Sequence, residues 1–124
     1  MNPDADPLFV QVARFIQDLI VDGALLPGDR APSTNELAAF HEINPATVRR
    51  GVGLLVDAGV LEVRRGLGTF VAPGAADAIL ADRRRQFPEV FLAPLIDEAL
   101  RLGYDREGLA ELMHKVAESR GMYR

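Results

Sequence analysis

Two helix starts in close succession constrain this chain more than any other feature. Ser33-Thr34-Asn35-Glu36 has the pattern of a capping box, in which Ser33 caps a helix and Glu36 reaches back to the cap. Asn44-Pro45 supplies a second N-cap, with proline in the first helical position, where its missing N–H is no loss. The sequence therefore predicts a short helix, a break at residues 41–43, and then a second helix. Three side chains of the short helix are expected to face inward, namely Leu37, Ala38 and Phe40.

The second helix is expected to run to about Asp57 and to close at Gly59. Its predicted buried residues are Val48, Val52 and Leu55. Gly51 and Gly53 lie inside it, and each costs about 1 kcal/mol relative to alanine. The sequence leaves two explanations open, because a glycine here can permit close packing or can simply be tolerated.

The segments on either side complete a recognisable order of elements. An apolar repeat at three and four residues predicts an amphipathic helix from Pro7 to Gly23, followed by a turn at residues 26–29. Residues 61–65 alternate, residues 66–68 turn and residues 69–71 return, which is typical of a β-hairpin. The fold class is therefore mostly α with a small β-hairpin, in the order of a winged helix-turn-helix domain.

A second, helical region follows, and we place the boundary between residues 1–74 and 75–124. Residues 76–102 have a helical pattern that Pro88 and Pro94 should kink or break, and Asp105 is placed to cap a last helix. The apolar stripe here is too large for two helices alone, so the region is expected to form a two-fold homodimer. An intramolecular helical hairpin with a ligand slot is the alternative, although about fifty residues leave little room for an effector pocket of roughly 300 Å³.

The second helix and the hairpin carry the residues expected to read DNA. A recognition helix uses its N-terminal turns on bases and phosphates, and here those turns offer Asn44, Ala46, Thr47, Arg49 and Arg50. The hairpin, or wing, adds Arg64 and Arg65, and Gly66 lets the backbone come close to a sugar-phosphate.

Charge and composition bear on the same question. Fourteen Lys+Arg against eighteen Asp+Glu give a formal net charge of −4, which taken alone argues against nucleic acid. Residues 44–66, however, hold four arginines against Asp57 and Glu62, so this segment is net positive.

Other classes of function find little support in the residues. The chain has no cysteine and two histidines far apart, and no nucleophile–base pair is recognisable, so we expect no enzyme, no cofactor and no metal site. No apolar window is long enough to cross a membrane, and the first twenty residues lack the pattern of a signal peptide. A soluble, cytoplasmic protein is expected.

The motifs together resemble the DNA-binding domain of the GntR family of bacterial transcription regulators. The matching stretches are Pro27-Gly28-Asp29-Arg30, Pro32-Ser33, Glu36-Leu37-Ala38, Asn44-Pro45 with Thr47-Val48-Arg49-Arg50, and Arg65-Gly66-Leu67-Gly68-Thr69-Phe70-Val71. The Asn-Pro-x-Thr-Val-Arg-Arg string is similar to the YtrA-like subgroup, which has a short C-terminal region of two helices. The resemblance implies a dimeric repressor that binds double-stranded DNA at a palindromic operator.

Thr47, Arg49 and Gly66 match the family's DNA-contact pattern, and Arg65 occupies a wing position that contacts DNA in related proteins. This chain departs from the pattern at three positions. Asn35 stands where the family usually has a phosphate-clamping arginine, Ala46 where a longer polar or basic residue is common, and Glu42 where the turn usually has glycine. The candidate DNA-binding residues are Ser33, Asn35, Asn44, Ala46, Thr47, Arg49, Arg50, Arg64, Arg65 and Gly66.

The sequence thus predicts a sequence-specific DNA-binding regulator. The three departures and the net charge support an alternative, a winged-helix protein-interaction module that does not bind DNA.

Overall fold

The computed structural model describes residues 6–123. The chain divides into two compact units, Met1–Asp82 and Arg83–Arg124. In chain order the elements are α1 (Leu8–Val21), α2 (Thr34–His41), α3 (Pro45–Asp57), β1 (Leu61–Arg64), β2 (Gly68–Val71), α4 (Ala75–Phe87), a π-helical turn η1 (Pro88–Leu92), α5 (Ala93–Arg101) and α6 (Arg106–Ser119).

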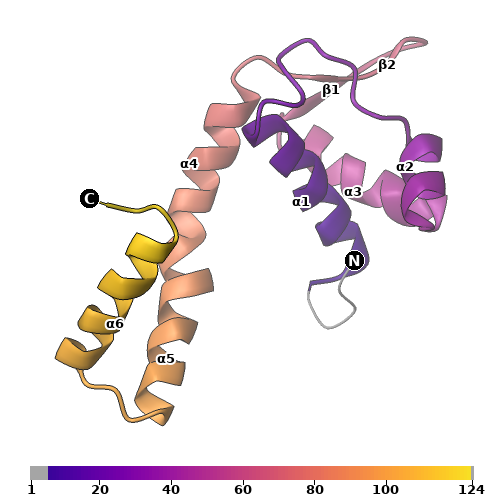
Figure 1. Ribbon diagram of the computed structural model, residues 1–124. Helices are drawn as coiled ribbons and strands as arrows, with labels where there is room; N and C mark the ends of the chain where they lie inside the picture. The colour runs from indigo at the N-terminus through magenta and orange to yellow at the C-terminus, as the bar shows by residue number, and fades with distance from the viewer. Residues whose placement is uncertain (1–5, 124) are drawn as a thin grey trace. The chain divides into compact units, whose positions relative to one another are not determined.

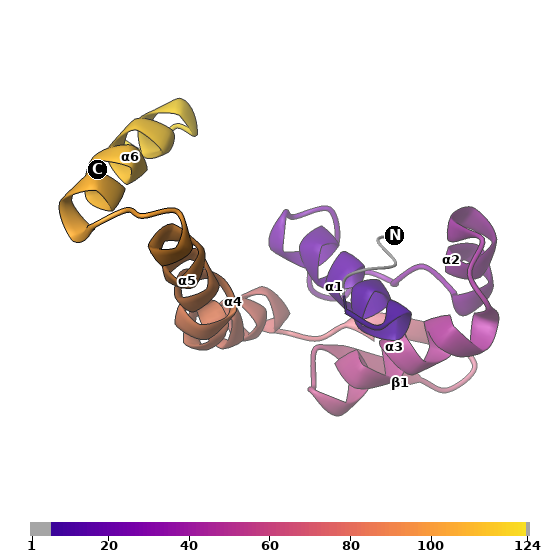
Figure 2. The same cartoon turned by 90° about the horizontal axis from the view of Figure 1, so that it is seen from below.

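The first unit is a three-helix cluster with an antiparallel hairpin (Figures 1 and 2). α3 packs against both α1 and α2, and β1 pairs with β2 from Leu61 opposite Val71 to Arg64 opposite Gly68. Its innermost side chains are at most 2 % exposed and come from α1, α3, both strands and the start of α4: Ile16, Val48, Leu55, Leu61, Val71 and Ile79. The winged helix-turn-helix expected from the sequence is confirmed.

Side-chain caps start α2 and α3 where the sequence predicts them. The Ser33 hydroxyl oxygen accepts a hydrogen bond from the Glu36 backbone N–H at 3.1 Å. The Asn44 side-chain oxygen accepts from the Ala46 N–H at 2.8 Å, with Pro45 in the first turn of α3. Between the helices, Glu42 adopts the left-handed conformation at φ 54°, the strained geometry that glycine favours.

The residues of α2 that face the core differ from those predicted. Phe40 was expected in the core but is 81 % exposed. The inward stripe of α2 follows the helical spacing from Thr34 through Leu37 and Ala38 to His41, and Phe40 falls outside it. His41 takes the inward place, with its ring edge-on to Phe15 at a centroid distance of 4.8 Å.

A third strand-like segment lies beside β2, where the sequence pattern predicts only a turn. The turn is present, because the Asp29 carboxylate accepts from the Leu26 N–H at 2.8 Å. The chain then runs along β2: Ala31 N–H donates to the Thr69 carbonyl, Val71 N–H donates to the Asp29 carbonyl, and Arg30 bridges Phe70. The hairpin is thereby attached to the loop that leads into α2.

The two glycines of α3 have different surroundings. A Cβ on Gly51 would lie 2.6 Å from the Phe9 carbonyl oxygen and 2.9 Å from Val12, so Gly51 allows α1 and α3 to approach closely. A Cβ on Gly53 would meet nothing within 4 Å. Close packing therefore explains Gly51, and simple tolerance explains Gly53.

The second unit is an antiparallel helical hairpin of α5 and α6 (Figure 1). All residues from Ala75 to Arg101 are helical, so Pro88 and Pro94 do not break the helix, and of the two expected outcomes, a kink or a break, the break is wrong. Pro88 begins the π-helical turn η1, in which the Ala93 N–H donates to the Pro88 carbonyl. Asp105 caps α6 as predicted, accepting from the Gly108 N–H at 2.7 Å.

Apolar side chains of the second unit are mostly in contact with solvent. Within residues 83–123, Ala99 is the only side chain in the buried class. Two grooves flank the contact of α5 with α6, one of about 630 Å³ and one of about 380 Å³. Across the described part of the chain, none of the helices has the length and apolar character that a membrane span needs.

Candidate nucleic-acid interface

The outward face of α3 offers one unobstructed cation between two small residues. Ala46 and Arg49 are exposed one turn apart, and Gly53 follows in open space on the same side. No carboxylate or aromatic ring holds Arg49 in the part of the chain that the structure describes. The small neighbours leave this side of the helix shallow, so it can approach the floor of a groove with Arg49 extended.

Arg50 is exposed but not loose. Its guanidinium carbon lies 3.7 Å from the centroid of the Phe9 ring on α1. This cation–π contact restricts the Arg50 side chain before any ligand binds, and it leaves the edge of the guanidinium available to an anion. Arg50 therefore lies beside the face that carries Arg49 and is suited to a phosphate more than to a base.

The remaining candidates on α2 and α3 divide into capping and free groups. Ser33 and Asn44 use a side-chain oxygen to cap their helices, and each retains a donor. Thr47 is half-buried, whereas Asn35 and Ala46 are exposed. The structure thus brings these side chains to the starts of α2 and α3, where backbone N–H groups favour an anion.

The wing carries one arginine that stacks on a ring and one that no other side chain of residues 6–123 holds. Arg64 stacks on Phe70, with its guanidinium carbon 4.2 Å from the ring centroid. Arg65 is exposed in the turn, next to Gly66 at φ 76°. The conformation at Gly66 favours glycine and presents bare backbone at the wing tip.

Sequence reasoning missed three residues that shape this interface. Phe9 and Phe70 are only apolar positions in the sequence pattern, yet each supports an arginine. Arg30 is only the last residue of a family motif in the sequence, and in the structure it lies against Gly68 of the wing. The signal for the aromatic pairs is weak, because each joins residues far apart in the sequence or on different strands.

Within the described residues, no group of three or more His, Asp or Glu side chains is arranged to hold a metal ion. What the geometry does provide is a capped helix with exposed arginines beside a basic wing. These features define the class of winged helix-turn-helix DNA-binding proteins.

The family follows from comparison with known proteins. Residues 8–71 match the profile of the bacterial regulatory proteins of the gntR family. The chain is 30 % identical over 111 residues to the HTH-type transcriptional repressor YtrA of Bacillus subtilis, covering 90 % of this chain and 85 % of YtrA. The chain belongs to the GntR family, and its likeness to YtrA supports the YtrA-like subgroup.

Solved structures agree with this assignment. A GntR family transcriptional regulator from Listeria monocytogenes aligns with a TM-score of 0.73 at 27 % identity, covering 92 % of this chain and 98 % of that one. The DNA-binding domain of AraR, in complex with operator ORX1, aligns with a TM-score of 0.53 at 35 % identity over 58 % of this chain and 87 % of that one.

The chain is therefore a DNA-binding transcription regulator of this family and not an enzyme. The alternative of a protein-interaction module without DNA binding is not favoured.

Proposed function

We propose that the protein is a homodimeric repressor that binds a palindromic operator in double-stranded DNA. The observation that carries the proposal is the pairing of a capped, arginine-bearing α3 with a basic wing in the first unit. Each subunit would place α3 in a major groove, with the two helices about 34 Å apart and the wings toward the flanking minor grooves. The likeness to a protein named as a repressor, YtrA, supports repression, and the AraR complex supports operator binding.

Residues 1–74 would form the DNA-binding domain, and residues 75–124 would form the dimerisation region. Arg49 would reach base edges or phosphates, and Thr47 and Asn44 would bond nearby oxygens. Arg50, Arg64 and Arg65 would neutralise phosphates, and the Gly66 backbone would lie close to the sugar-phosphate chain. Ser33, Asn35 and Ala46 would lie beside the duplex without adding charge.

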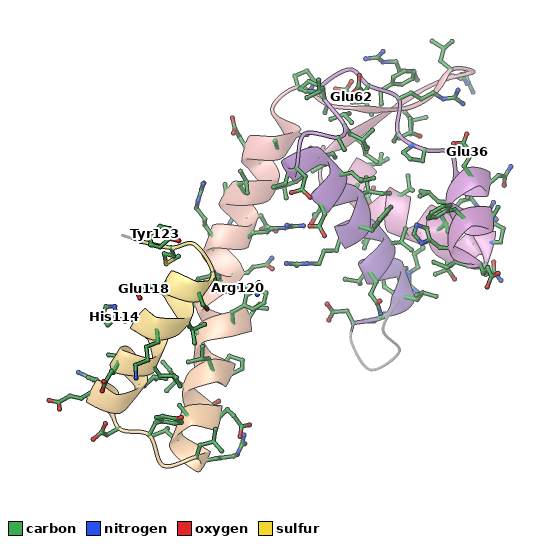
Figure 3. The ribbon with its side chains drawn as sticks, viewed as in Figure 1. Glu36, Glu62, His114, Glu118, Arg120 and Tyr123 are labelled. Atoms are coloured by element: carbon green, nitrogen blue, oxygen red, sulfur yellow. The ribbon has the colours of Figure 1, made fainter. Side chains whose placement is uncertain are left out.

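Homodimerisation through the C-terminal helices is supported by the exposed apolar surface of α5 and α6. Val116 and Leu102 are 51 % and 67 % exposed in the 630 Å³ groove, and Leu95 and Met113 also line it. His114 and Glu118, in contrast, project from the side of α6 that faces away from α5 (Figure 3). A second copy of the chain would cover the apolar side and leave the polar side in water.

The same grooves hold more space than the length of this region suggests. Both exceed the roughly 300 Å³ of a small ligand pocket. A second subunit would fill this space from outside, so we propose no small-molecule effector.

Selection from a random-sequence DNA library tests the operator. We expect the wild-type chain to enrich an inverted repeat, because a two-fold dimer presents the same reading surface twice. Enrichment of single half-sites without symmetry, or of no sequence at all, would contradict the proposal. A reporter gene placed behind the enriched sequence should lose expression when the protein is present, and a rise in expression would contradict repression.

Two substitutions separate base reading from phosphate binding. Arg49→Ala should weaken binding to the enriched operator by about 1–3 kcal/mol, measured by gel shift at one fixed salt concentration. Arg65→Ala should weaken binding to all sequences alike and make the salt dependence shallower. Unchanged operator affinity in Arg49→Ala would remove that residue from the reading surface.

Light scattering tests the dimer. Val116→Asp places a charge in the apolar groove and should turn the dimer into a monomer, whereas His114→Asp on the polar side should leave it intact. A monomeric wild-type chain, or a Val116→Asp variant that stays dimeric with native circular dichroism, would show that this surface does not form the interface.

A further inference from the structure

Arg30 is fixed to the wing by backbone pairing. The hydrogen bonds from the Ala31 N–H to the Thr69 carbonyl and from the Gly28 N–H to the Val71 carbonyl are both 2.8 Å long. They align the segment with β2 on the side opposite β1, and Arg30 bridges Phe70 directly. Residues that lie opposite each other in such a ladder point to the same face, so Arg30 and Phe70 share a face of the sheet.

That face is the outer one. Leu61 and Val71 lie opposite each other and are 2 % and 0 % exposed, so their face of the hairpin covers the core. Side chains alternate along a strand, which places Phe70, Gly68 and Arg64 on the other face. Glu62 shares this outer face, on the far side of β2 from Arg30, and Figure 3 shows its position on the hairpin.

The Arg30 side chain runs along β2 toward the wing tip. Its Nε would be 2.8 Å from a Cβ built on Gly68, and its guanidinium carbon 3.5 Å. Gly68 is two residues nearer the turn than Phe70, the residue that Arg30 bridges. The missing side chain at Gly68 is therefore what allows this arginine to lie flat and carry its charge outward along the wing.

The Arg30 guanidinium has no ion-pair partner among the described residues. Arg64 stacks on Phe70 at the neighbouring position of the same face, so two guanidinium groups lie on either side of β2. An anion bound on this face would therefore lie beside two positive charges.

The start of α2 lies at the same place. Arg30, Ser33, Thr34 and Thr69 line a small polar hollow of about 130 Å³. α2 itself contains no lysine or arginine, and Asn35 in its first turn is neutral. Arg30 is thus the cation that lies between the wing and the start of α2.

We propose that Arg30 is a third arginine of the wing and binds a phosphodiester group of the DNA backbone. Its guanidinium would donate to the phosphate that passes between the wing and α2, supplying the charge that Asn35 does not. The proposal rests on DNA binding by this chain but needs neither the palindrome nor repression. The proposal also explains the glycine at position 68, since any side chain there would displace Arg30.

The salt dependence of binding to a random-sequence DNA duplex tests this role. Fluorescence anisotropy at a series of salt concentrations gives the slope of log K against log salt, whose magnitude is about 0.9 for each phosphate that the protein neutralises. Arg30→Ala should make the slope shallower by about this amount per bound subunit. Arg30→Lys should keep most of the slope, because a phosphate accepts any cation placed beside it.

Arg14→Ala is the matched control, because it removes one exposed positive charge from α1, away from the wing. It should leave the slope at the wild-type value, while Arg30→Ala and Arg14→Ala should unfold at similar urea concentrations. An Arg30→Ala slope equal to that of wild type and Arg14→Ala would overturn the assignment with DNA binding intact. A wild-type chain with no salt-dependent binding would overturn both the assignment and the DNA-binding role.

Discussion

Alanine in place of Gly51 or Gly53 is the same chemical change at two sites of α3 that differ only in their surroundings. In an exposed helix position, alanine is more favourable than glycine by about 1 kcal/mol. Gly53 is in open space, so Gly53→Ala should raise the free energy of unfolding by roughly that amount. Gly51 has the same intrinsic preference but no room for the added methyl group.

The cost at Gly51 follows from the distances. Carbon atoms in contact normally lie about 3.5–4.0 Å apart. The new Cβ would lie 2.6 Å from the Phe9 carbonyl oxygen and 2.9 Å from two atoms of Val12. Because one of these atoms belongs to the backbone of α1, no side-chain rotation relieves the overlap and the helices must separate. Overpacking of this kind typically costs about 1–3 kcal/mol.

The difference between the two variants isolates that packing cost, since the helix preference cancels. We expect Gly51→Ala to be about 1–3 kcal/mol less stable than Gly53→Ala. Urea unfolding followed by circular dichroism, at one protein concentration, measures both variants against wild type. Equal m-values would show that the same surface is exposed in each case. Equal stabilisation by both substitutions would refute the close contact of α1 with α3.

Two further predictions concern the turn between α2 and α3. Glu42→Gly should relieve the strain of the left-handed backbone and raise the free energy of unfolding by about 1 kcal/mol in thermal melts, whereas Glu42→Gln should not. Both variants remove a negative charge and should bind DNA more tightly at low salt. Equal stability of the two variants would contradict the strain at Glu42. Asn44→Ala removes the cap of α3 and should lower the free energy of unfolding by about 1 kcal/mol, whereas Asn44→Ser should keep the cap. If the serine variant is as stable as wild type but binds the operator more weakly, the Asn44 amide contacts DNA.

The sequence predicts best those features that a few adjacent residues determine. Ser33, Asn44 and Asp105 cap their helices where expected, because a cap depends on a side chain and backbone N–H groups no more than three residues away. The hairpin is equally local. These signals are sufficient for the fold class and for the placement of α3 and the wing.

Features that depend on distant partners are not predictable in the same way. Arg30 pairs with β2, which follows α2 and α3 in the sequence, and nothing in the residues around Arg30 indicates this pairing. Hydrophobicity alone places Phe40 inward, although the helical spacing gives that place to His41. The packing role of Gly51 depends on where α1 lies, which only the folded chain decides.

The acidic total of this chain, −4, is compatible with DNA binding because of how its arginines are held. Arg50 and Arg64 are stacked on the rings of Phe9 and Phe70, so each has already given up part of the side-chain entropy that binding a phosphate would cost. A positioned cation gives more affinity per charge than a mobile one, since less ordering remains to be done on binding. A chain with few basic residues in its reading surface can therefore bind an operator more tightly when some of them are held in place, as Arg50 and Arg64 are. The excess of acidic residues elsewhere in the chain repels the DNA backbone and so weakens binding to non-specific sequences. Tight binding then requires two linked half-sites, one for each subunit.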